Sequence, residues 1–345
     1  MLVSTDAVRG PANRVWGVVR AHRSNDVVAH ANSLSSWQQQ YDQLASGAFR
    51  GSLEELWFED VQVFRERTSH AVRQVCRIRE DAIWCGVTVR HDGSRIEGLD
   101  VGHDGVMVCG HGAPFELLTP DGHEIFGIVA SRKALLDHAD AAGVALDTGL
   151  LDHATWLPCG TRPQSHLRDC LDSLLHLAPI AGIADAGTAT VPSGNAVQGA
   201  GRAHRRAQQA ALDALFEVLA TPSRLGSDVA ERAGFERRRQ LVRRVSAHVQ
   251  ECGGEIPTVP DLCEMLHVSR RTLQNGFQRV LDVSPLAYLK AVRLHQARQA
   301  LKRVSSVTEA ATAFGFWHFG HFSRDYQTMF GEPPSATLRR YVKRS

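Results

Sequence analysis

The chain has 345 residues, of which 43% are hydrophobic and 22% are charged, proportions typical of a globular protein that buries a core. The length favours two or three folded units over a single domain. No apolar run is long enough to cross a membrane and the N-terminus lacks a signal-peptide core, so we expect a cytoplasmic protein. The seven cysteines include no C-x-x-C pair, which argues against a disulfide framework or a zinc knuckle.

The net charge of +2 conceals an uneven distribution along the chain. Residues 231–345 carry 19 lysines and arginines against 10 aspartates and glutamates, a balance of +9. Residues 1–230 carry 20 against 27, a balance of −7. A basic end attached to an acidic body indicates a polyanion as the partner of that end, the alternative being an asymmetry without function.

The first half of the chain is predicted to be rich in β-strands. Residues 1–31 read as a flexible N-terminal segment, and residues 33–44 read as a short helix capped by Ser33 or Ser35. Short β-prone runs follow at residues 53–60, 61–68, 72–78 and 83–89. Because Asp-Gly turns punctuate the remainder, we expect residues 49–130 to form an antiparallel sandwich or barrel.

The pattern becomes helical after residue 130. Apolar residues at helical spacing predict helices over residues 131–143, 165–178 and 202–220. Residues 182–201 are rich in Gly, Ala, Ser and Thr and are predicted to form an exposed loop. These helices complete a helical part over residues 131–221, and a further helix at 239–252 opens the C-terminal region.

A helix-turn-helix pattern occupies residues 258–281. Thr258 caps a first helix that runs to Leu266, and Ser269 caps a second one after a short turn. In the second helix an apolar stripe that includes Leu273 and Phe277 faces inward. Its outward residues have the planar polar groups that can read base edges in the major groove; they are Arg270, Arg271, Gln274, Asn275 and Gln278.

The same pattern recurs at residues 306–330. A short Ala-rich helix ends before Gly315, and a second helix runs over residues 318–330 with Tyr326 in the place that Phe277 has in the first unit. Its outward polar residues are His321, Ser323, Arg324 and Gln327. A connecting helix over residues 285–303 would span nearly 30 Å at about 1.5 Å per residue, close to the separation of successive major grooves.

These segments resemble the AraC/XylS family of transcriptional regulators. The resemblance rests on DLCEMLHVSRRTLQNGFQRVLDVSPLAYLKAVRLHQARQAL and on VTEAATAFGFWHFGHFSRDYQTMFGEPPS, and it covers about 100 residues. It implies that Arg271, Gln274 and Asn275 face bases, that Arg270 and Gln278 contact bases or phosphates, and that the second reading helix reads fewer bases. A helical bundle whose polar faces are merely solvated is the alternative.

The resemblance also implies a sensing or dimerisation domain ahead of the DNA-binding part. SSWQQQYDQL, DVQVFRERTSHAVRQ, IWCGV and FELLTPDGHEIFGIV look like activators of ethanolamine-utilisation operons. This implies a cupin-like barrel, with ethanolamine and adenosylcobalamin as effectors and no cofactor needed for folding. A small ammonium ligand favours a carboxylate and aromatic faces, and the candidates are Trp57, Glu59, Phe64, Trp84 and Glu116, for which barrel core or a solvated face is the alternative.

The sequence thus predicts an α+β protein in three parts. Residues 1–31 form the flexible segment, residues 32–235 the β-rich sensing or dimerisation domain with its helices, and residues 236–345 an all-α DNA-binding domain. The implied function is a ligand-responsive transcriptional activator, nucleoid-associated in the cytoplasm, whose partners are double-stranded DNA, RNA polymerase, a small effector and a second copy of the chain.

Three alternatives remain open from the sequence. A metal-dependent enzyme on a cupin-like barrel would need an H-x-H cluster, which is missing between residues 72 and 101, and neither a metal site nor a nucleophile elbow nor a phosphate-binding loop is recognisable, so we expect no enzyme. A regulator of a different catabolic operon fits the same C-terminal motifs. A ligand-independent N-terminal dimerisation module also fits them.

Overall fold

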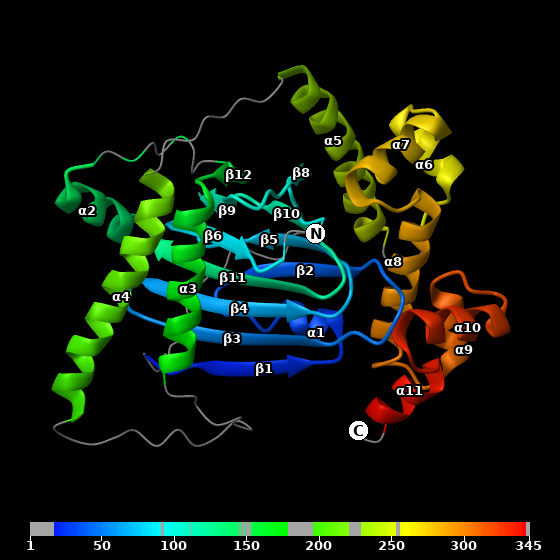
Figure 1. Cartoon of the computed structure of the whole chain (residues 1–345). Helices are drawn as coiled ribbons and strands as arrows, with labels where there is room; N and C mark the ends of the chain where they lie inside the picture. Colours follow the sequence, from blue (N-terminus) through cyan, green and yellow to red (C-terminus); the bar gives the residue numbers. More distant parts are fainter. Residues whose placement is uncertain are drawn as a thin grey trace.

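The computed structural model describes residues 17–90, 93–110, 112–144, 146, 149, 153–178, 196–220, 229–252 and 256–342. Within them a β-rich N-terminal half precedes an all-helical C-terminal region, as Figure 1 shows. The predicted α+β class is confirmed. No helix within these ranges is long and apolar enough to span a membrane.

Twelve strands of the described chain form two antiparallel sheets. The seven-stranded sheet has the order β1-β3-β4-β11-β6-β9-β12 and the five-stranded sheet has the order β2-β5-β10-β7-β8. The strands of the larger sheet are β1 (Arg20–Ser24), β3 (Gly51–Trp57), β4 (Val61–Thr68), β11 (His123–Ser131), β6 (Ala82–Thr88), β9 (Gly105–Gly110) and β12 (Thr155–Pro158). The strands of the smaller sheet are β2 (Gln38–Gln43), β5 (Val72–Arg77), β10 (Phe115–Thr119), β7 (Arg95–Ile96) and β8 (Leu99–Asp100).

Alternation along the strands builds two cores. On β4, Val61 and Val63 point to one face, and Phe64 points to the other. The first face packs against α3 (Thr161–Leu177) and α4 (Ala196–Ala220), and the second packs between the sheets. In Figure 1 these two helices cover one face of the larger sheet. Because β4 is covered on both sides, even its polar residues Gln62, Glu66 and Thr68 are buried.

The N-terminal predictions need two corrections. Residues 20–31 are not a flexible segment, because β1 pairs with β3 and α1 (Val27–Ala31) buries Val27 against the barrel; residues 1–16 lie outside the described part. Residues 33–44 are not a helix, because β2 pairs with β5 and buries Tyr41 between the sheets. Long-range pairing overrides the helical preference of the glutamines there.

The predicted helices at residues 131–143, 165–178 and 202–220 are confirmed as α2 (Arg132–Ala142), α3 and α4. Of the predicted loop at 182–201, residues 182–195 lie outside the described residues, and 196–201 already belong to α4. The predicted boundary between residues 235 and 236 falls inside α5 (Val229–Glu251), so one continuous helix leads into the C-terminal region.

The C-terminal region contains two small cores that share one helix. The other helices are α6 (Val259–Leu266), α7 (Arg270–Leu281), α9 (Val307–Ala313), α10 (Phe319–Phe330) and α11 (Pro334–Val342). The shared helix α8 (Pro285–Ala300) packs Tyr288 into the first core and Leu294 into the second. Since each side of α8 meets a different unit, the helix is apolar around much of its circumference.

Candidate nucleic-acid interface

The first helix-turn-helix unit is defined by its caps. Thr258 and Asp261 form a reciprocal capping box at the start of α6, which satisfies two otherwise unpaired backbone donors. His267 ends α6 in the left-handed conformation, and Ser269 caps α7 by accepting from the N–H of Thr272. The two helices are therefore separated by a turn that local hydrogen bonds fix.

Helix α7 has one buried face and one exposed polar face. Leu273 and Phe277 are fully buried, and the ring of Phe277 lies 5.3 Å from that of Tyr288 on α8. All five residues predicted to read bases or phosphates are exposed. The side chains of four of them make no hydrogen bond within the described chain, whereas Gln278 donates to Asp282 at 2.6 Å. The exposed face of α7 thus matches the prediction from the sequence.

The second unit repeats this arrangement. Ser306 caps α9, Gly315 adopts a φ of +75° in the turn, and α10 buries Phe322 and Tyr326. Tyr326 exchanges a hydrogen bond of 2.8 Å with the hydroxyl of Thr337 on α11. The predicted contact residues His321, Arg324 and Gln327 are exposed, and Ser323 is half-buried.

A groove of about 520 Å³ lies between the two units. Arg270 at the start of α7 and Asp325 on α10 both line it, so α7 and α10 border the same side of the domain. Its floor comes from α8, where Lys290 pairs with Asp325 at 2.8 Å and Arg293 donates to the carbonyl of Ile256. Three cations against one carboxylate make this groove positively charged, which suits a phosphate backbone.

The connecting helix is shorter than predicted. α8 has 16 residues, and residues 301–303 form a turn instead of continuing the helix. At about 1.5 Å per residue it spans about 24 Å, less than the 30 Å expected from the sequence. Leu301, the first residue of this turn, is fully buried in the second core.

Comparison with known proteins agrees with this geometry. A helix-turn-helix domain family matches residues 262–340. The chain is 31% identical over 118 residues to the XylDLEGF operon transcriptional activator 2 of Pseudomonas putida, covering 33% of this chain and 74% of that relative. The chain belongs to the AraC/XylS family.

Other AraC/XylS relatives match over less of their length. The probable thc operon regulatory protein of Rhodococcus erythropolis is 39% identical over 106 residues, 29% of this chain and 30% of the relative. A XylDLEGF operon transcriptional activator of Pseudomonas putida is 33% identical over 123 residues, which make up 34% of this chain and 38% of that relative. The chain therefore spans about a third of these relatives. The match to the solved AraC-like transcriptional activator CuxR covers 80% of this chain and 94% of CuxR, at 16% identity and a TM-score of 0.36. These values are too low to establish that the two proteins arrange their parts alike.

The candidate ligand residues in the N-terminal half of this AraC/XylS protein do not form one site. Trp57, Phe64 and Trp84 are buried on the inner face of the larger sheet, with Phe64 and Trp84 in the core between the two sheets. Glu59 is exposed in the turn between β3 and β4. Glu116 lies on the outer face of the smaller sheet, where it accepts from Arg73 at 2.5 Å. Only the aromatic residues therefore share a face of one sheet.

Sequence reasoning missed the polar groups that accompany these aromatic rings. Trp37, misassigned to a helix, contacts Phe64, Trp84 and Phe115 edge-on. Glu55 on β3 is 2% exposed and accepts from Trp57 Nε1 at 2.9 Å and from Ser35 Oγ at 2.7 Å. Because side chains alternate along a strand, Glu55 lies on the same inner face of β3 as Trp57, two residues later. The alternation could have predicted this position of Glu55 from the sequence.

A second buried carboxylate, Glu66, lies deeper between the sheets. His30 Nε2 lies 3.0 Å from it and the hydroxyl of Tyr41 donates at 2.9 Å. Burial by itself would raise the pKa of Glu66, but the hydrogen bond and charge of His30 outweigh it and the pKa lies below its usual value. Glu66 is thus an ionised group with protein partners of its own.

Proposed function

We propose that the chain is a sequence-specific DNA-binding transcriptional regulator that places α7 and α10 in adjacent major grooves. The observation that carries the proposal is the exposed Arg/Gln/Asn face of α7, presented on the same groove-bordered side as α10. Bidentate side chains of these types discriminate bases, and the cations of the intervening groove would contact phosphates.

Within this proposal the nine outward residues divide by role. Arg271, Gln274 and Asn275 read bases in the first half-site, because their side chains are exposed and unengaged. Gln278 is tied to Asp282 and contributes to backbone contact together with Arg270, which lines the groove. His321, Ser323, Arg324 and Gln327 serve the second half-site.

The proposal extends to activation of an operon in the bacterial cytoplasm. It is supported by the names of the relatives, several of which are operon transcriptional activators. RNA polymerase is then a partner and a second copy of the chain is another. The same names belong to operons other than ethanolamine utilisation, which supports a regulator of a different catabolic operon as the alternative.

Ligand response remains part of the proposal, with ethanolamine and adenosylcobalamin as the effectors that the sequence resemblance implies. The aromatic cluster of Trp37, Trp84 and Phe115 offers ring faces and edges for an ammonium group. Glu55, the carboxylate on the same inner face of the larger sheet as Trp84, already accepts four hydrogen bonds, from Ser35, Trp57 and Gln62, so it would have to exchange partners to bind a cation.

The experiment that tests DNA binding is selection of duplexes from a random pool by the full-length protein. We expect enrichment of a defined sequence that binds at least a thousandfold more tightly than random DNA. Enrichment of nothing above random would contradict the proposal. Calorimetric titration with ethanolamine and with adenosylcobalamin tests the effectors separately, since a ligand-independent dimerisation module gives no saturable heat with either.

A further inference from the structure

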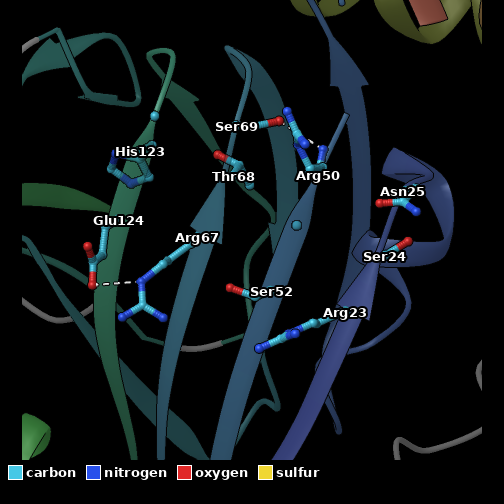
Figure 2. A pocket seen from close by; sticks show the side chains of 12 residues that line it. Arg23, Ser24, Asn25, Arg50, Ser52, Arg67, Thr68, Ser69, His123 and Glu124 are labelled. Atoms are coloured by element: carbon cyan, nitrogen blue, oxygen red, sulfur yellow. Dashed lines mark hydrogen bonds and ion pairs between the residues drawn. The ribbon is translucent and has the colours of Figure 1, made fainter. Parts of the chain in front are cut away.

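A pocket of about 390 Å³ lies where β1, β3, β4 and β11 meet at one end of the larger sheet. Figure 2 shows Arg23 on β1 and Arg67 on β4 reaching from either side of Ser52 on β3. The register explains this placement, because Ser52 pairs with both arginines across adjacent strands. Arg50, directly before β3, borders the same pocket.

The pocket carries an excess of positive charge. Three arginines line it against one carboxylate, Glu124, to which Arg67 Nε donates at 3.0 Å. Arg67 pairs with Glu124 and lies 3.9 Å from Glu54. The guanidinium groups of Arg23 and Arg50, by contrast, make no ion pair within the described chain. An anion bound in this pocket would supply the opposite charge that Arg23 and Arg50 lack.

Hydroxyl donors complete the lining. Thr68 also borders the pocket, but alternation along β4 turns its buried side chain toward the core between the sheets, on the face opposite to Arg67. The hydroxyl of Ser52, on the same face as Arg67, makes no hydrogen bond within the described residues, whereas Ser24 and Ser69 bond to their own backbone surroundings. A ligand oxygen in the pocket could therefore accept from Ser52, which pairs with Arg23 on one side and Arg67 on the other.

The nature of the lining also restricts the body of the ligand. Apart from the ring of His123, no aromatic or aliphatic side chain contributes to it. Apolar ligands gain their affinity from such contacts and are disfavoured here. A cation such as ethanolamine is disfavoured by the three arginines. The chemistry therefore fits a small hydrophilic molecule that carries an oxyanion.

We propose that this pocket binds a small hydrophilic carboxylate or phosphate between Arg23, Arg50 and Arg67. Carboxylate and phosphate oxygens both match the planar fork of arginine and accept from serine hydroxyls. The site is separate from the aromatic cluster between the sheets and supplies the N-terminal half with a ligand class of its own.

The walls of the pocket continue into contacts with the DNA-binding region. One wall includes Asn25, and its neighbour Asp26 pairs with Arg298 and Lys302, at the end of α8 and in the turn after it. The other wall includes Arg50, three residues after Gly47, whose N–H donates to the carbonyl of Met329 on α10 at 3.1 Å. Ligand binding there would bear on α10 and on the connecting helix α8, a coupling that rests on the proposed function.

Calorimetry on the full-length protein tests the site directly. Sodium phosphate and sodium succinate are titrated at constant ionic strength, balanced with sodium chloride. We expect saturable binding of at least one of them, and the stronger of the two identifies the oxyanion. Arg23→Gln and Arg50→Gln each weaken binding at least tenfold, while Arg77→Gln, an exposed arginine of the other sheet, leaves it unchanged. Ser52→Ala, which removes the hydroxyl between Arg23 and Arg67, also weakens binding.

Either of two results would contradict the proposed site. The first is that phosphate and succinate both give the same heats as chloride, and the second is that the Arg23 and Arg50 variants bind the anion as tightly as the wild type does. The coupling is measured separately, as the affinity for the selected duplex with and without the bound anion. An unchanged affinity overturns the coupling and leaves the site standing. Failure to select any duplex contradicts the proposed function and leaves the calorimetric result unaffected.

Discussion

Asp26 and Arg298 join the two halves of the chain, with Nε of Arg298 3.1 Å from Oδ2 of Asp26. Lys302 reaches the same oxygen at 3.1 Å, and Asp26 also caps α1. Burial would raise the pKa of Asp26, but the N–H of Ala29 and the two cations outweigh it, so the pKa lies below its ordinary value. The position of the DNA-binding region therefore depends on charges in the N-terminal half.

Asp26→Asn isolates this ion pair, because asparagine keeps the helix cap and removes only the charge. Arg298 keeps Glu332 as a partner at 3.3 Å, and only its contact with Asp26 is lost. Since a hydrogen bond to a charged group contributes about 1.5–3 kcal/mol, we expect a loss of that size in the free energy of unfolding. Denaturant unfolding measures it. Asp100→Asn, which breaks the exposed pair with Arg95, is the control and costs less than about 1 kcal/mol. Equal effects of the two variants would show that the contact does not hold the halves together.

His295 predicts a pH dependence of stability. Burial lowers its pKa, and the opposing effects of Asp42 and the carbonyl of Gln43 do not offset this. Below about pH 6.5 the unfolded chain binds a proton that the folded chain refuses, so stability falls as the pH drops toward the lowered pKa, by at most about 1.4 kcal/mol per pH unit.

The comparison is between the wild type and His295→Gln, by thermal unfolding at about pH 7.5 and about pH 5.5. We expect the wild type to lose more stability than the variant over this range. His22 and His204, whose pKa values are also lowered by burial, contribute equally to both proteins and cancel. Parallel losses in the two proteins would exclude His295 as a source of the dependence.

Arg271→Ala tests base reading by α7. The side chain is exposed and has no hydrogen bond within the described chain, so its removal leaves the fold intact. We expect a loss of about 1–3 kcal/mol in binding to the selected duplex and relaxed preference at one base pair. Arg77→Ala changes the charge equally on the other half of the chain and serves as the control. If Arg271→Ala bound specific and random duplexes as the wild type does, the residue would have no part in reading.

Phe277→Ala tests the core of the first unit. The ring is fully buried against α5 and α8, so its truncation leaves a cavity and costs about 3–5 kcal/mol. Phe319→Ala removes an exposed ring from α10 and costs less than about 0.5 kcal/mol. Calorimetric unfolding distinguishes them, and a Phe277 variant as stable as the Phe319 variant would mean that the two helices do not pack as described.

Local signals explain why the C-terminal half could be predicted from the sequence. Thr258 and Ser269 each cap a helix where expected, and the buried stripe of Leu273 and Phe277 follows from helical spacing alone. Capping and periodicity act within a few residues, so no knowledge of distant contacts was needed.

The N-terminal half depends on contacts that are distant in the sequence. β11 lies between β4 and β6 in the larger sheet, and Arg73 donates a hydrogen bond to Glu116, which lies 43 residues further along the chain. No local pattern specifies such partners, so individual strands were predictable while their order was not. The misassigned residues 33–44 show the same effect, as does the pocket of Arg23, Arg50 and Arg67, which four separate strands create.

The central claim is that two helices of one chain read adjacent major grooves, and hydroxyl-radical footprinting on the selected duplex tests it most directly. We expect two protected stretches on one face of the DNA, centred about 10–10.5 base pairs apart. In the Arg271→Ala variant, protection weakens over one stretch only. A single protected stretch, or two stretches on opposite faces of the duplex, would contradict the claim.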